Sequence, residues 1–157
     1  MTEQVQQEPM SAQEKEEQIK RWNQEEFVKV QKFCVSKGVQ PKKIEQSRTQ
    51  CLPPVLGVWY VNSTTKGEDY WVLSGQLPTD LAPAKVANHA REALRYFSMN
   101  WQLKAANIED AIAEGKFTGE NKNTQEAFAK ELVSKAEALY QIYSDEKLWA
   151  QTGLKAS

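Results

Sequence analysis

The residues best suited to hold a small ligand fall in two short runs of the chain. The run Ser74–Asp80 ends on a carboxylate, and the run His89–Glu92 contains the only histidine together with an arginine. A helix start, an arginine fork and an imidazole together suit a small anion. We therefore expect any ligand pocket to use five side chains: Ser74, Thr79, Asp80, His89 and Arg91.

The same residues have ordinary structural roles. Asp80 and Thr79 can fix a turn or cap a helix through their own side chains. His89 can form a hydrogen bond to the loop from the first turn of a helix. Arg91 can pair with a nearby acid, and Asp80 and Glu92 are both close in sequence. We expect Asp80 to neutralise Arg91, which would close the pocket and leave the pair as a brace between loop and helix.

The sequence excludes several kinds of chemistry. One histidine rules out the two-histidine metal motifs, and there is no Gly-rich phosphate loop, G-x-S-x-G elbow or E-x-x-H pair. Cys34 and Cys51 lack the spacing of metal ligands or of a disulfide framework. We therefore expect no catalytic residue, no metal site and no cofactor.

Charge and hydropathy limit the kinds of partner that the chain can bind. Lysine and arginine total 20 against 21 acidic side chains, so no field of one sign attracts nucleic acid or an anionic membrane. No window approaches the ~20 apolar residues of a membrane span. The acidic, glutamine-rich residues 1–18 resemble no secretory signal. We expect a cytoplasmic protein with neither a nucleic-acid nor a membrane partner.

Helices must supply most of the scaffold. Apolar residues at three- and four-residue steps predict a helix over 13–36, ended by Gly38, and a second from 84 or 89 to 114, ended by Gly115. Asn123 with Glu126 has the spacing of a capping box for a third helix. Ser144-Asp145-Glu146 predicts the start of a short terminal helix.

Two aromatic runs, Val55–Val61 and Tyr70–Leu73, predict a β-hairpin around a polar turn. The simplest register places Trp59 opposite Trp71 and Tyr60 opposite Tyr70. Both strands are apolar on both faces, so helices must cover each side. Residues 39–54 and the segment Ser74–Pro83 are expected to be loops.

The predicted fold is therefore α+β: mostly helical, with one antiparallel β-hairpin packed against about four helices. A third strand would join the sheet if residues 39–54 supplied one. We expect residues 1–12 to form a disordered arm and residues 13–153 to form a single domain. Open hairpin edges and apolar surface would also favour self-association, through edge-to-edge strand pairing or hairpin packing across a two-fold axis.

The run Tyr70–Asp80, the segment 89–93 and the later run 145–149 resemble an uncharacterised family of small gammaproteobacterial proteins. The likeness covers roughly residues 20–150, and W-V-x-S-G-x-L-P-T-D is its specific part. Gln76 stands where the family pattern has aspartate, and Ala90 where it has proline. The family implies a domain boundary and no activity.

Two classes of function remain open. The first is a small non-enzymatic regulatory or protein-interaction module, whose partner is a second copy of the chain or a different protein. The second is a small anionic-ligand binder or an enzyme, with its pocket where the Ser74–Asp80 loop meets the helix start at His89–Glu92. The missing metal ligands, nucleophile–base pair and cofactor loop favour the first class.

Overall fold

The computed structural model describes residues 9, 11–65 and 67–154. In chain order its elements are α1 (Ala12–Ser36), β1 (Pro41–Ile44), β2 (Gln50–Leu52), β3 (Leu56–Ser63), β4 (Asp69–Gly75), β5 (Asp80–Pro83), the 3₁₀ turn η1 (Ala84–Val86), α2 (Ala90–Ala113), α3 (Gly119–Ser144) and α4 (Glu146–Trp149). The α+β class is confirmed, with four helices. The arm expected over 1–12 lies mostly outside the described residues, and Ser11 already caps α1.

The sheet is larger than the predicted hairpin. Its strands are all antiparallel in the order β1-β3-β4-β5, and β2 also pairs with β3. The segments expected to be loops, 39–54 and Ser74–Pro83, thus contribute β1, β2 and β5. The physical reason is that the two central strands are buried, so their outer N–H and C=O groups need partners. Short flanking segments supply them despite weak sequence patterns.

The gap between β1 and β2 is bridged by a side chain. β1 pairs with β3 from residue 61 onward, and β2 pairs with it up to residue 58. Between them, the Tyr60 N–H donates to Thr49 Oγ1 at 3.0 Å, and the Glu45 N–H donates to the Tyr60 carbonyl at 2.9 Å. The Thr49 hydroxyl therefore supplies the acceptor that a continuous neighbouring strand would offer to the Tyr60 N–H.

The register of the central hairpin differs from the prediction by one residue. Trp59 lies opposite Val72, and Tyr60 lies opposite Trp71. The predicted register would have put both tryptophans on one face, because directly paired residues share a face. The observed register gives each face one indole. Trp59 faces α1, and Trp71 meets Tyr60 edge-on, with ring centroids 4.9 Å apart.

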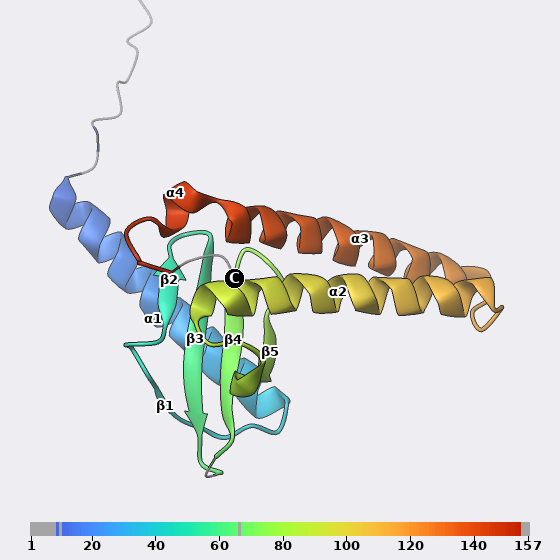
Figure 1. The fold of residues 1–157 in the computed structure, drawn as a ribbon, viewed down its shortest axis with the longest axis horizontal. Coiled ribbons are helices and arrows are strands. Elements are labelled where there is room, and N and C mark those ends of the chain that lie inside the picture. The colour runs from blue at the N-terminus through green and yellow to red at the C-terminus, as the bar shows by residue number, and fades with distance from the viewer. Residues whose placement is uncertain (1–8, 10, 66, 155–157) are drawn as a thin grey trace, which may run out of the picture.

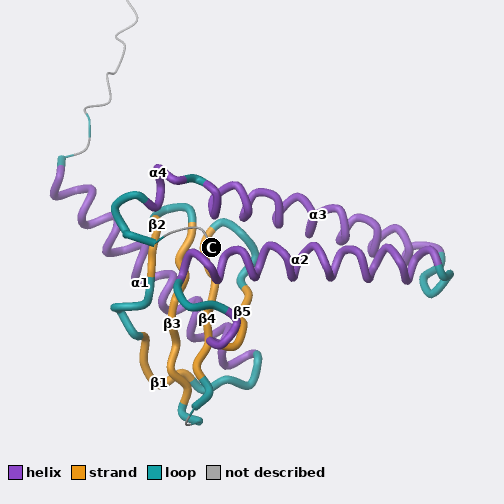
Figure 2. Tube along the Cα trace, in the orientation of Figure 1, coloured by secondary structure: helices purple, strands orange, loops and turns teal. Residues whose placement is uncertain are grey.

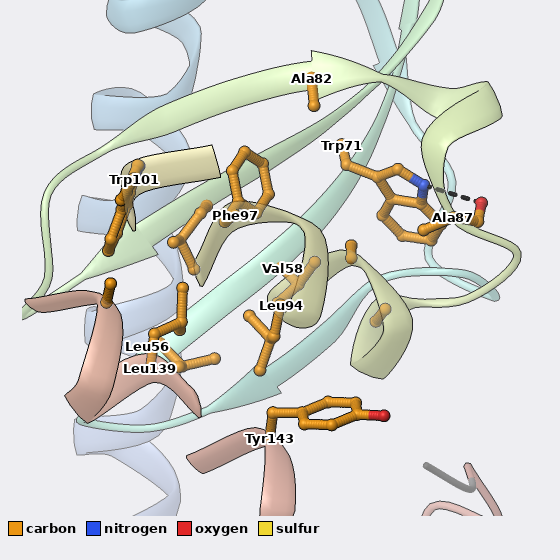
Figure 3. Close-up of a cluster of buried hydrophobic side chains, with 14 of the residues drawn as sticks. Leu56, Val58, Trp71, Ala82, Ala87, Leu94, Phe97, Trp101, Leu139 and Tyr143 are labelled. Carbon is orange, nitrogen blue, oxygen red and sulfur yellow. Dashed lines mark hydrogen bonds between the residues drawn. The ribbon is translucent and has the colours of Figure 1, made fainter. Parts of the chain in front are cut away.

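Helices cover both faces of the sheet, as predicted. α1 crosses behind the strands, and α2 crosses in front of them, with α3 packed antiparallel against α2 (Figures 1 and 2). The α2 side holds the larger core, in which the Trp71 indole N–H donates to the Ala87 carbonyl at 3.2 Å (Figure 3). The α1 side holds a smaller core of six buried residues: Val30, Cys34, Val39, Trp59, Val61 and Val72.

The helix ends were predicted with mixed success. Gly38 and Gly115 have φ of 79° and 76° just after α1 and α2, the left-handed conformation that glycine adopts cheaply. Asp145 caps α4 by accepting from the Lys147 and Leu148 N–H groups. The capping box at Asn123 is wrong, because α3 begins one turn earlier, after Thr118. Thr118 occupies the N-cap position, but its side chain makes no capping hydrogen bond.

The open hairpin edges that suggested self-association are occupied. β1 and β2 cover one edge, and β5 covers the other. The outer strands are at most four residues long and carry Pro41, Lys42, Lys43 and Pro83, which discourage further pairing. The hairpin edges on which the predicted edge-to-edge pairing rested are therefore already paired with other strands of the same chain. No described helix is both long enough and apolar enough to cross a bilayer.

We predict that Thr49→Val lowers the free energy of unfolding by about 1–3 kcal/mol, because the buried Tyr60 N–H loses its acceptor. Thr49→Ser keeps the oxygen and serves as the control. Urea unfolding of the two variants is the measurement. Equal stabilities within about 0.5 kcal/mol would show that this bond does not hold the sheet.

Candidate functional site

Ser74, the first of the predicted ligand residues, is buried in β4 on the α1 side of the sheet. Its hydroxyl accepts a hydrogen bond from the Trp59 indole N–H at 2.9 Å. The indole lies over Gly57, where a Cβ would come within 2.6 Å of the indole nitrogen. Gly57 and Ser74, paired across the sheet, therefore position Trp59.

Asp80 opens β5, and its carboxylate is held by α2. It accepts from the Trp101 indole N–H and from the Leu81 N–H, both at 2.8 Å, and lies 4.0 Å from Lys104 Nζ. Thr79 and Asp80 border a hollow of about 290 Å³, around which three lysines (Lys37, Lys104, Lys135) nearly balance two acids (Asp80, Glu131). The three lysines are far apart in the sequence, with Lys37 directly after α1, Lys104 on α2 and Lys135 on α3, so spacing alone could not bring them together.

His89 and Arg91 lie at the other end of the predicted site. His89 is the N-cap of α2, and its Nδ1 accepts from the Glu92 N–H at 3.2 Å. Arg91 is fully buried and donates to the carbonyls of Tyr143 and Leu154 at 2.9 Å, and to Glu146 Oε1 at 3.0 Å. Its guanidinium also lies 5.5 Å from the Tyr143 ring centroid.

The predicted pairing of Asp80 with Arg91 is therefore wrong. Asp80 bonds to Trp101, ten residues beyond Arg91, which is about 15 Å along the helix axis. Arg91 instead joins the start of α2 to the C-terminal segment that follows α3. The structure does not bring the two halves of the predicted site together. The expected brace exists, with different partners.

A larger hollow lies elsewhere, beside the N-terminal half of α1. We call it the α1 groove. It has a volume of about 800 Å³, with Ile19, Asn23, Phe27 and Val28 on the helix side and Cys51 and Trp59 on the sheet side. Ile19, Phe27 and Val28 keep 47%, 37% and 46% of their surface exposed. Large apolar side chains therefore remain in water along this groove.

The groove exists because α1 is longer than the sheet beneath it. Twenty-five helical residues span about 37 Å, whereas β3, the longest strand, spans about 27 Å. Only the C-terminal half of α1 packs on the core, and every residue from Ser11 to Arg21 is exposed. Figure 1 shows the N-terminal turns extending past the strands. Helical periodicity alone did not distinguish this overhang, although a comparison of helix length with strand length would have indicated it.

The thiol of Cys51, which lines the α1 groove, has little nucleophilic character. Burial, with a smaller contribution from the nearby Glu26 carboxylate, raises the pKa of Cys51 from 9.0 to about 11. Burial also raises the pKa of Cys34. A thiolate is the nucleophilic form of cysteine, so these shifts oppose covalent chemistry. Within residues 9, 11–65 and 67–154, no three histidine, cysteine or acidic side chains are grouped to hold a metal ion.

We predict that Arg91→Ala lowers the free energy of unfolding by about 2–5 kcal/mol, because the Tyr143 and Leu154 carbonyls each lose the Arg91 guanidinium as a donor. Arg95→Ala, on the same helix but exposed, should change it by less than about 0.5 kcal/mol. Urea unfolding measures both, and limited proteolysis should show earlier cleavage after residue 144 in the Arg91 variant only. Equal losses would mean that Arg91 is not a brace.

We also predict slow alkylation of Cys51 at pH 8. About a tenth of a thiol with a pKa of 9.0 is ionised there, against about a thousandth at a pKa of about 11. Iodoacetamide labelling of Cys51, followed by peptide mass spectrometry, should be about a hundredfold slower in the native protein than in guanidinium. Similar rates in the two conditions would contradict the raised pKa.

Comparison with known proteins gives a family and no activity. No curated protein and no solved structure matches the chain. A family model described as a domain of unknown function (DUF4826) matches residues 16–149, which span α1 to α4 and include both sides of the α1 groove. The expected membership in a family of unknown function is thereby confirmed. Because the match covers most of the chain, the protein belongs to the DUF4826 family.

Proposed function

We propose that this protein is a non-enzymatic interaction module whose α1 groove holds a short peptide segment of a partner protein. The observation that carries the proposal is the row of half-exposed apolar side chains, Ile19, Phe27 and Val28, along a hollow of about 800 Å³. That volume lies within the range of ligand sites. Covering these side chains would remove apolar surface from water, at a gain of roughly 25 cal/mol per Å².

The shape of the groove favours a chain segment over a small molecule. Its lining residues on α1 run from Glu16 to Val28, which is about 18 Å along the helix. An extended peptide rises about 3.3 Å per residue, so five or six residues would fill this length. Polar residues line the groove between the apolar ones, among them Lys20 and Gln24. An alternation of apolar and polar contacts suits a peptide with alternating side chains.

The hydrogen-bond partners of the polar residues that suggested a ligand pocket support a binding role for the groove instead. Ser74 holds Trp59, Asp80 holds Trp101, His89 caps α2 and Arg91 binds the C-terminal segment. Each of these polar side chains thus has a structural partner that serves the scaffold. We place the interaction in the bacterial cytoplasm, in keeping with two cysteines that form no disulfide.

The proposal predicts that peptides selected for binding lose affinity when the groove is charged. Twelve-residue peptides displayed on phage would be selected against the wild-type protein, and their dissociation constants measured by fluorescence anisotropy. Val28→Glu should weaken binding of the selected peptides by about tenfold or more, because a charge replaces an apolar side chain that a bound peptide would cover. Glutamate favours helix at least as well as valine, so α1 should remain folded.

Val35→Glu is the matched control. Val35 lies on the same helix, is 52% exposed and does not line the groove. It should leave peptide affinity unchanged. The groove would be ruled out as an interaction site if no peptide were enriched, or if the Val28→Glu and wild-type proteins bound the selected peptides equally well.

A further inference from the structure

The hollow of about 290 Å³ beside Asp80 has a partly aromatic lining that is drawn from three helices. Phe33 belongs to α1, Trp101 to α2 and Phe128 to α3. Trp101 is almost fully buried, whereas Phe128 keeps 51% of its surface in water. The volume is close to the lower end of the range of small-molecule sites. An aromatic ring placed in the hollow would therefore cover apolar surface that the fold leaves exposed.

Two of the lysines that line this hollow have no acidic partner. Within the part of the chain that the structure describes, no carboxylate oxygen lies within 4.0 Å of the Nζ of Lys37 or Lys135. Lys37 Nζ instead lies 5.5 Å from the Phe33 ring centroid, beside the aromatic lining. The Thr79 hydroxyl, also at the hollow, forms no hydrogen bond to another described residue. Charged and neutral donors are thus available to a ligand.

The two acids at the hollow leave these donors available. Asp80 accepts from the Trp101 indole N–H and the Leu81 N–H, and its nearest cation is Lys104, at 4.0 Å. Glu131 is exposed and lies on the same helix as Lys135, without an ion pair among the described residues. Three lysines against two acids leave one positive charge around the hollow. One bound negative charge would balance it.

We propose that the hollow beside Asp80 is a second binding site, which takes a small carboxylate with an aromatic body. The ring would pack against Phe33 and Phe128, and the carboxylate would accept from Lys37, Lys135 and Thr79. A free phosphate would meet the same cations but would leave the aromatic lining in water. The site shares no lining residue with the α1 groove, so the two sites are tested separately.

The test is an NMR titration of the isotope-labelled protein with hydrocinnamate, a phenyl ring on a short carboxylate chain. The amide signals of residues 79–80 and 128–135 should shift until they saturate. Hydrocinnamyl alcohol has the same ring and chain without the charge, and it should bind about fivefold more weakly. The proposal is overturned if these signals do not saturate, if the α1 groove signals shift instead, or if the acid and the alcohol bind equally.

Three substitutions on α3 separate a specific site from general attraction of anions. Lys135→Met keeps most of the side-chain length and should weaken hydrocinnamate by about two- to fivefold, while leaving the alcohol unchanged. Lys130→Met is the control, because Lys130 is exposed on the same helix and does not line the hollow. Glu131→Gln removes a competing carboxylate and should tighten hydrocinnamate by a similar factor, a gain that a loss of stability cannot produce. Equal effects of the two lysine substitutions, or no gain in Glu131→Gln, would contradict the site.

Discussion

Strands β3 and β4 carry large apolar side chains on both faces, and the need to bury these side chains determines where the long helices pack. Trp71 and Tyr60 point toward α2, whereas Trp59 and Val72 point toward α1. A sheet with only one covered face would leave an indole in water. One long helix on one side and an antiparallel pair on the other meet the requirement. The outer strands complete the hydrogen bonds of the same two central strands.

The helices on the two faces are longer than the sheet, and the parts that extend past the strands do not pack on its core. α2 and α3 bury each other where they extend past the strands (Figure 1). Within the described part of the chain, no second helix covers the N-terminal turns of α1, so they keep apolar side chains in water beside β2. The α1 groove is thus a direct consequence of covering a short sheet with a single long helix.

The polar residues that suggested chemistry serve this architecture. Asp80 ties β5 to α2 through Trp101, and Arg91 ties the C-terminal segment to the start of α2. The sequence predicted that Arg91 would act as a brace, but it named the wrong partner. Glu146 lies 55 residues away in the chain and Leu154 lies 63 residues away. Proximity in sequence favoured Asp80 and Glu92, and packing brought the distant residues instead.

By itself the sequence determined the helices, the central hairpin and the need to cover both its faces, because these depend on local periodicity and on apolar residue types. Glycine at 38 and 115 likewise marked helix ends, through a conformation that few other residues adopt. Only the tertiary structure decided the hairpin register, the outer strands and the partners of Asp80 and Arg91. Those features depend on contacts between segments far apart in the chain. The α1 groove belongs to the same group, since it exists only where a helix and a sheet of unequal length meet.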